Sequence, residues 1–154
     1  MITLENSIQI SVSSQTVFQL VTRPDLWHTW HPASESAELS RVPLQLNDTF
    51  DEYINVKAFP GLPFYIRRHT HYTVTEISEN KAWQVKGKSN IFELSIRYKL
   101  KSTENHTHFV RLLKYRVTSP LLNLLEPLVI RQTIKKQSAI ALKNLKTLLE
   151  SNEA

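Results

Sequence analysis

The sequence predicts an α+β fold in which a curved antiparallel sheet of seven strands wraps around one long C-terminal helix. The middle of the chain is a series of runs in which apolar and polar residues alternate with a period of two, which is typical of strands buried on one face. Residues 122–150 instead repeat apolar side chains at helical spacing. Because one sheet and one long helix bury their apolar faces against each other, we expect the sheet to curl around the helix and leave apolar space between them.

The N-terminal part should form one strand and two short helices. Alternation over residues 8–12 predicts a strand with one buried face. A helix is expected over 14–22, ending before Pro24, because the residue before a proline is disfavoured in a helix. A second short helix, over 25–30, should end before Pro32 for the same reason.

Six further strands should follow, joined by short connections that favour antiparallel hairpins. The predicted strands are 36–42, 49–56, 65–77, 81–88, 91–101 and 106–117. The connections hold turn-forming residues, namely Asn47-Asp48, Pro60-Gly61-Leu62-Pro63, Glu79-Asn80, Ser89-Asn90 and Thr103-Glu104-Asn105. The chain has only 2 glycines, Gly61 and Gly87, so asparagine and aspartate are expected to form most of the turns.

The C-terminal segment predicts an amphipathic helix from about Leu122 to Glu150, with Pro127 tolerated near its first turn. Its apolar face, which should pack on the concave side of the sheet, consists of Ile130, Ile134, Ser138, Ala141, Leu145 and Leu148. Its lysines fall on a separate arc, at Lys135, Lys136, Lys143 and Lys146.

Composition excludes several kinds of site. The chain has no cysteine, which excludes disulfides, a thiol nucleophile and thiolate metal ligands. Its first residues lack the basic start and apolar run of a signal peptide. The longest apolar stretch, 120–130, is too short for a membrane span and is interrupted by Asn123 and Glu126. We therefore expect one domain over residues 1–154, located in the cytoplasm.

The net charge of +5 is unevenly distributed, because most of the lysines and arginines lie in residues 57–154. Basic side chains on two consecutive strands could form a positive patch, namely Lys86, Lys88, Arg97, Lys99 and Lys101. Such a patch would either contact an anionic membrane surface transiently or be an ordinary solvated surface. Nucleic-acid binding also needs exposed aromatic residues or a reading helix, neither of which is evident, so no nucleic-acid partner is expected.

Four segments in a fixed order resemble one superfamily. Residues 8–22 are similar to the opening strand and first helix of the START-like (SRPBCC) superfamily, and Trp27-His28-Thr29-Trp30-His31-Pro32 is similar to its tryptophan-rich short helix. Thr73-Val74-Thr75-Glu76-Ile77 resembles its central strand, and residues 141–150 resemble the end of its C-terminal helix. The nearest branch is the polyketide cyclase/dehydrase group. The resemblance implies a helix-grip fold and covers lipid carriers, quinone-binding proteins and cyclases alike.

Two charged residues fall on strand faces assigned to the interior. Glu52 shares a side with Phe50, and Arg111 shares a side with Leu113. A buried charge is costly unless it is paired. Either the two residues form the polar end of a pocket and hold a ligand carboxylate, carbonyl or hydroxyl, or they pair with each other, or they lie in water at a strand end.

The inward-facing residues of the strands and helix define the predicted ligand-binding set. It comprises Glu52, Ile54, Tyr72, Trp83, Val85, Leu94, Ile96, Tyr98, Arg111, Leu113, Tyr115, Ile134 and Ala141. If the protein is an enzyme, then Glu52, Arg111 and Tyr115 are the candidate proton-transfer groups. No cofactor is expected, because glycine-rich phosphate loops and other catalytic motifs are absent.

The histidines come partly in pairs, of which His69 with His71 and His106 with His108 lie two apart on predicted strands. Residues two apart on a strand point the same way, so each pair could chelate a metal. A third ligand is not evident for either pair, so no metal site is expected. The first pair shares a face with Arg67, which is assigned to the outer, wet side.

Three hypotheses for function remain open at this stage. The preferred one is a non-enzymatic carrier or sensor of one small hydrophobic molecule, such as a lipid, quinone or polyketide. The second is a cyclase or dehydratase that acts on a polyketide-like substrate. The third is a protein-interaction module with a filled core, which docks through its basic face.

Overall fold

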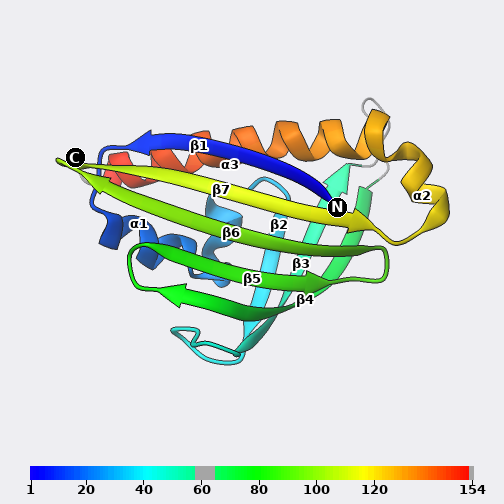
Figure 1. Ribbon diagram of the computed structural model, residues 1–154, viewed down its shortest axis with the longest axis horizontal. Helices are drawn as coiled ribbons and strands as arrows, with labels where there is room; N and C mark the ends of the chain where they lie inside the picture. Colours follow the sequence, from blue (N-terminus) through cyan, green and yellow to red (C-terminus); the bar gives the residue numbers. More distant parts are fainter. Residues whose placement is uncertain (58–64, 153–154) are drawn as a thin grey trace.

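The computed structural model describes residues 1–57 and 65–152, and their strands form one antiparallel sheet of 7 strands in the order β1-β7-β6-β5-β4-β3-β2. The strands are β1 (Ile2–Ile10), β2 (Ser34–Leu39), β3 (Thr49–Lys57), β4 (Tyr65–Ser78), β5 (Ala82–Lys88), β6 (Phe92–Thr103) and β7 (His106–Val117). The helical elements are α1 (Ser14–Val21), the 3₁₀ helix η1 (Pro24–Thr29), α2 (Pro120–Leu125), the π-helical turn η2 (Glu126–Ile130) and α3 (Arg131–Asn152). Figure 1 shows the sheet curving beneath α3. The predicted helix-grip fold is confirmed.

Asparagines form the turns that glycine would otherwise form. Asn47, Asn80 and Asn105 adopt positive φ angles of 70°, 61° and 57°. Asparagine tolerates this left-handed region better than other non-glycine residues. These positions lie in three of the predicted connections. The predicted Pro60–Pro63 turn lies outside the described residues.

Two strand predictions in the N-terminal third were wrong at their ends. β1 begins at Ile2 rather than near residue 8 and ends at Ile10, because the chain bends there and places Ser13 to cap α1 by accepting a hydrogen bond from the Thr16 N–H. The strand predicted over 36–42 is β2 and ends at Leu39. Beyond it the chain turns, with Arg41 3.1 Å from Asp48 in an ion pair within the connection.

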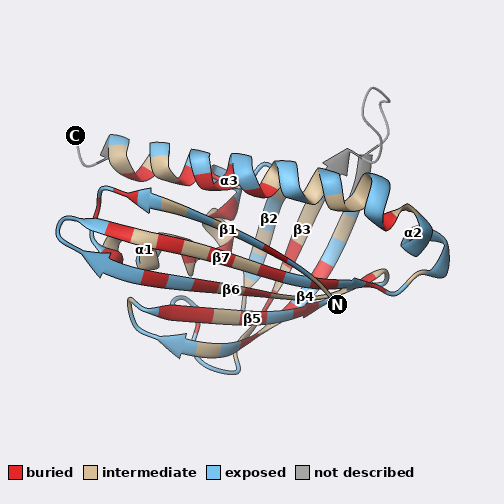
Figure 2. Cartoon of the chain, turned by 45° about the horizontal axis from the view of Figure 1, so that its top comes forward, coloured by how far each residue is buried: buried red, intermediate tan, exposed pale blue. Residues whose placement is uncertain are grey.

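The C-terminal helix starts at Pro120 and contains an irregularity that the sequence indicated only through Pro127. Proline lacks an N–H, so it cannot donate the hydrogen bond that a regular helix requires at that position. The chain widens here into the π-helical turn η2, in which the Arg131 N–H donates to the carbonyl of Glu126. The regular helix α3 then continues to Asn152. Figure 2 shows its buried residues facing the sheet.

Aromatic side chains fill the core beneath the N-terminal helices. Trp27 from η1 makes edge-to-face contacts with Phe50, Tyr72 and Trp83, at ring-centroid distances of 5.6, 6.2 and 6.1 Å. Its indole N–H donates to the carbonyl of Val21 at 2.8 Å. Trp27 and Tyr72 of this cluster also line the cavity described next.

Candidate ligand-binding site

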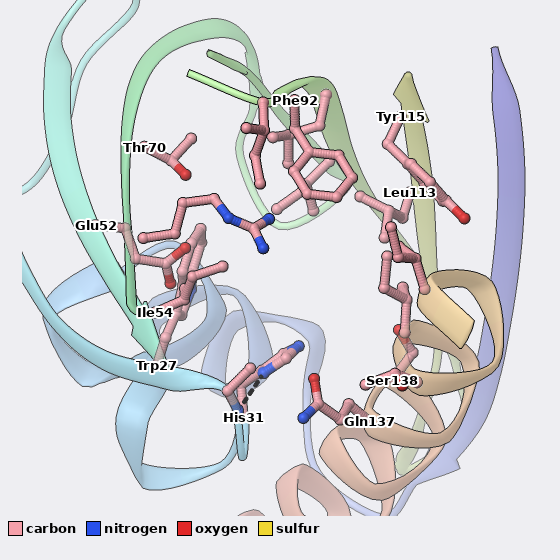
Figure 3. A pocket seen from close by; sticks show the side chains of 18 of the residues that line it. Trp27, His31, Glu52, Ile54, Thr70, Phe92, Leu113, Tyr115, Gln137 and Ser138 are labelled. Atoms are coloured by element: carbon pink, nitrogen blue, oxygen red, sulfur yellow. Dashed lines mark hydrogen bonds between the residues drawn. The ribbon is translucent and has the colours of Figure 1, made fainter. Parts of the chain in front are cut away.

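A cavity of about 220 Å³ lies between the concave face of the sheet and the helical segment from α2 to α3. Its wall is mostly apolar, with polar groups concentrated on a few side chains (Figure 3). A single buried water needs only roughly 10–15 Å³ measured in the same way. The cavity is therefore large enough for an organic molecule.

The carboxylate of Glu52 lies in the wall of this cavity and is 5% exposed. The Ser34 hydroxyl donates to its Oε2 at 2.9 Å, and the Tyr72 hydroxyl donates to its Oε1 at 3.3 Å. Burial raises the pKa of the Glu52 carboxyl to about 7, although these hydrogen bonds and Arg111 favour the ionised form. Glu52 can therefore hold or release a proton near neutral pH.

Gly87 allows Tyr72 to reach this carboxylate. The two residues lie opposite each other on β5 and β4, and a Cβ at position 87 would come within 2.5 Å of Tyr72 Cε1. Only glycine leaves room for the tyrosine ring to lie flat against the neighbouring strand. Burial raises the pKa of Tyr72 well above its usual value, so its hydroxyl stays a hydrogen-bond donor.

Arg111 on β7 is the second buried charge of the cavity, at 5% exposed. Its Nη1 donates to the Ser138 hydroxyl on α3 at 3.0 Å, and its Nε has no hydrogen-bond partner within residues 1–57 and 65–152. Among the described residues it forms no ion pair, and Glu52 is hydrogen-bonded to Ser34 and Tyr72 instead. Of the alternatives open from sequence, pairing with Glu52 and exposure at a strand end are therefore not observed.

His31, immediately after η1, brings an uncharged donor to the same wall. Its Nδ1 accepts a hydrogen bond from the Ala33 N–H at 3.1 Å, so the ring carries its proton on Nε2. Burial, together with the nearby charge of Arg111, lowers the pKa of His31 to about 3. The imidazole is therefore neutral at physiological pH and offers an N–H group.

A satisfied charge cluster lies next to the helical end of the cavity, where it contacts the wall residue Tyr115. Glu126 in η2 accepts hydrogen bonds from Arg131 Nε and Nη2 at 3.0 and 2.7 Å, and also from the Tyr115 hydroxyl. The side-chain hydrogen bonds from Arg131 lower the pKa of the Glu126 carboxyl. This cluster attaches the π-helical turn to β7 and so fixes the position of Leu122, Leu125 and Val129 on the cavity wall.

Comparison with protein families shows to which family this chain belongs. The family model for polyketide cyclase / dehydrase and lipid transport proteins matches residues 1–150. The chain belongs to this family. No curated protein sequence matches it.

Several solved structures share the fold at low sequence identity. The Zhui aromatase/cyclase from Streptomyces sp. R1128 is 9% identical with a TM-score of 0.75, covering 99% of this chain and 96% of its own. A START superfamily protein from Mycobacterium smegmatis is 13% identical with a TM-score of 0.70, covering 97% of each chain. A protein from Thermus thermophilus is 12% identical with a TM-score of 0.75, covering 99% of this chain and all of its own. At such identities the likeness shows the fold alone.

Most of the residues that the sequence predicted to bind a ligand lie on the cavity wall. They are Glu52, Ile54, Tyr72, Leu94, Ile96, Tyr98, Arg111, Leu113, Tyr115 and Ile134. Trp83, Val85 and Ala141 are instead buried in the packed core and do not line the cavity. They face inward as predicted, but the aromatic cluster around Trp27 fills the space next to Trp83. Ligand contact by the wall residues stays a prediction.

Sequence reasoning missed several wall residues, of which Arg68, His31 and Trp27 matter most. Arg68 could have been found, because it lies on the same, inner face of β4 as Tyr72. Its guanidinium lies over the Phe92 ring at 4.3 Å, and burial lowers its pKa to about 10. Trp27 in η1 and His31 just beyond it had no such signal, because a short 3₁₀ helix has no periodicity that marks an inner face.

His69 and His71 lie on the outer surface, as predicted. The structure adds a third group that sequence reasoning did not find, because Asp51 Oδ1 lies 2.7 Å from His69 Nε2 and 2.9 Å from His71 Nδ1. Even so, no set of three potential ligands within residues 1–57 and 65–152 is arranged to hold a metal ion. In the same part of the chain, no helix is long and apolar enough to cross a membrane.

The basic side chains of β5 and β6 are interleaved with other groups. The strand register places Ser95 opposite Lys86 and Glu93 opposite Lys88. Arg97 Nη2 forms an ion pair with Glu76 at 3.0 Å. These neutral and acidic neighbours reduce the positive charge of the patch that the sequence suggested. Which molecule, if any, binds this patch stays a prediction.

Proposed function

We propose that residues 1–154 form a single domain that binds one small hydrophobic molecule, such as a lipid, quinone or polyketide-like compound, and that it acts as a cytoplasmic carrier or sensor. The observation that carries this proposal is the apolar cavity between the sheet and α3, with Glu52 and Arg111 in its wall. Pockets for organic ligands characteristically combine apolar walls with a few placed polar groups. Membership of a family that includes lipid transport proteins supports the same function.

Native mass spectrometry of the gently purified protein tests this proposal. We expect a stoichiometric adduct that denaturation releases as an apolar compound. Ile134→Trp, on the cavity wall, should abolish the adduct, whereas Ile140→Trp, at an exposed position on the same helix, should leave it in place. A protein that carries no adduct and does not bind the neutral probe N-phenyl-1-naphthylamine would contradict the proposal.

Transient docking to an anionic membrane would let such a carrier load and unload. Three leucines of α2 and η2, namely Leu121, Leu124 and Leu128, are 72%, 76% and 77% exposed. The neighbouring Leu122 and Leu125 line the cavity, so one short segment faces both solvent and the proposed ligand. Leu124→Asp should weaken sedimentation with phosphatidylserine-containing vesicles, whereas Ile140→Asp, also at an exposed position, should not. Equal sedimentation of both variants would argue against docking through α2.

Cyclase or dehydratase chemistry is the second candidate function. It is favoured by Glu52, whose carboxyl has a pKa of about 7 inside a cavity and so suits general acid–base work. Tyr115 is less suited to that work, because its hydroxyl already donates to Glu126. Glu52→Gln or Arg111→Ala should abolish turnover of a polyketide-like substrate without unfolding the protein, and full activity in both variants would exclude this site. The interaction-module hypothesis assumed a filled core, which the cavity does not favour.

A further inference from the structure

Arg111 is a buried cation that forms no ion pair with any of the described residues. Its Nη1 donates to the neutral Ser138 hydroxyl, and in that same part of the chain its Nε has no partner. Burying a guanidinium in an apolar wall is costly unless a negative group lies against it. Arg68, the other arginine of the wall, also has a buried Nε without a partner among the described residues, but the face of Phe92 covers its charge at 4.3 Å.

The groups around Arg111 are mostly hydrogen-bond donors. His31 is neutral with its proton on Nε2, and Tyr98 lies directly opposite Arg111 in the strand register. Glu52 is the nearby acceptor, and it is already hydrogen-bonded to Ser34 and Tyr72. A guanidinium with adjacent N–H and O–H donors is the arrangement that proteins use to hold a carboxylate.

The strand register places this donor cluster at the inner end of the cavity. Moving from Arg111 along β7 toward α2, the wall passes through Leu113 opposite Ile96 and then Tyr115 opposite Leu94. On the facing side, the cavity wall continues through Ile134, Ile130, Leu125 and Leu122. From Arg111 toward α2 the wall is therefore mostly apolar, and its polar side chains there are Thr133 and Gln137 on α3 and Arg68, whose charge lies over Phe92.

We propose that the ligand is an apolar monocarboxylic acid that enters head first, with its carboxylate against Arg111 and its hydrocarbon part extending toward α2. This inference rests on the proposed function, because it assumes that the cavity holds a small molecule. Glu52 carries its proton when the acid is bound, since two carboxylates in one cavity do not both stay ionised. The charged and titratable groups around Glu52 are His31, Arg68, Tyr72, Tyr98 and Arg111.

Competitive displacement of N-phenyl-1-naphthylamine by decanoic acid and by 1-decanol tests the head group, because the two compounds share one tail. We expect the wild-type protein to bind the acid at least about 10-fold more tightly than the alcohol. Arg111→Met should remove this preference by weakening acid binding alone. Lys114→Met, on the outer face of the same strand, should leave the preference unchanged. The wild-type comparison needs no variant, so it stands even if Arg111→Met does not fold.

The outcomes separate this inference from the proposed function. Equal or tighter binding of the alcohol would overturn the carboxylate inference and leave the hydrophobic-ligand function intact. Failure of both compounds and of the neutral probe to bind would overturn both. For the orientation, decanoic acid with a nitroxide at its far end should broaden the NMR signals of Leu122 and Ile130. Broadening of the Trp27 and Trp30 indole signals instead would overturn the head-first arrangement.

Discussion

Two buried glutamates, Glu52 in the cavity wall and Glu126 hydrogen-bonded to the wall residue Tyr115, have opposite environments. Glu126, 3% exposed, accepts two hydrogen bonds from Arg131 and one from Tyr115, and its pKa is lowered. Glu52, 5% exposed, accepts hydrogen bonds only from two neutral hydroxyls, and burial raises its pKa to about 7. The two pKa values therefore shift in opposite directions, because desolvation dominates at Glu52 whereas the hydrogen bonds from Arg131 outweigh desolvation at Glu126.

The difference distinguishes a structural charge from one available for function. Glu126 is fully satisfied and holds the π-helical turn against β7, so a ligand could add little to it. Glu52 and Arg111 are both in the cavity wall without an ionic partner among the described residues, so the folded protein bears a cost that a bound polar group would reduce. Unsatisfied buried charges of this kind are expected at binding sites and rare elsewhere.

The largest predicted effect is a change in pH-dependent stability in Glu52→Gln. The folded-state pKa of about 7 exceeds the usual 4.5, so the native state binds more protons than the unfolded state between these values. Wild-type stability should therefore fall as pH rises from about 4.5 to 7 and then level off. The variant lacks this loss, so its stability relative to wild type should rise by as much as about 3 kcal/mol over that range.

Urea denaturation at a series of pH values measures this difference. Glu38→Gln, at an exposed position on the neighbouring strand β2, is the matched control and should parallel the wild type throughout. A constant difference between Glu52→Gln and wild type from pH 4.5 to 8 would show that Glu52 is ionised in the folded protein. It would also remove the contrast with Glu126.

The opposite sign is predicted for Glu126→Gln. Because the folded-state pKa of Glu126 is lowered, its ionised form stabilises the protein above the unfolded-state pKa, and this contribution is lost as pH falls. We expect the variant to be less stable at pH 7 by about 1–3 kcal/mol, the usual cost of leaving a buried partner unsatisfied. The deficit should shrink on acidification. A deficit that grows toward low pH in the same urea series would contradict this assignment.

Gly87→Ala should disturb the inner end of the cavity without removing a charged group. The added Cβ would meet the Tyr72 ring at 2.5 Å, so the ring must move and its hydroxyl must leave Glu52. Overpacking of this kind costs about 1–3 kcal/mol. We expect a lower thermal midpoint together with weaker binding of N-phenyl-1-naphthylamine. An unchanged midpoint would mean that the ring shifts freely and that its contact with Glu52 is incidental.

Much of the fold could be predicted because its signals are periodic. The alternation along β6 and β7 assigned inner faces correctly, including those of Tyr98, Arg111 and Tyr115. The asparagine turns followed from the scarcity of glycine. The ends of β1 and β2 were wrong, because exposed edge strands of mixed polarity lack a sharp pattern where they begin and end.

The site was harder to predict, because its chemistry depends on which inner-face residues meet. Periodicity placed Glu52 and Arg111 inside the sheet. It could not say that Glu52 would accept hydrogen bonds from Ser34 and Tyr72, or that Arg111 would donate one to Ser138. Nor could it separate Trp83, which packs against Trp27, from Tyr98, which packs there and also lines the cavity. Some of those choices are made by η1 and α3, whose contacts with the strands, such as Trp27 with Trp83 and Ser138 with Arg111, join residues distant in sequence.

The smallest predicted effect tests whether burial, rather than charge alone, produces the contrast. Asp51 contacts His69 and His71 on the outer face, and its side chain is 34% exposed. The hydrogen bonds from His71 and His69 lower its pKa, as Arg131 does for Glu126. Because exposed pairs are screened by water and salt, Asp51→Asn should cost less than about 1 kcal/mol and should lose that difference in high salt. Urea denaturation at low and high ionic strength measures both. A salt-independent loss of stability as large as that of Glu126→Gln would show that an exposed carboxylate on this sheet stabilises the protein as much as one buried beside the cavity. Exposure would then not explain why Glu52 and Glu126 differ from the acids around them.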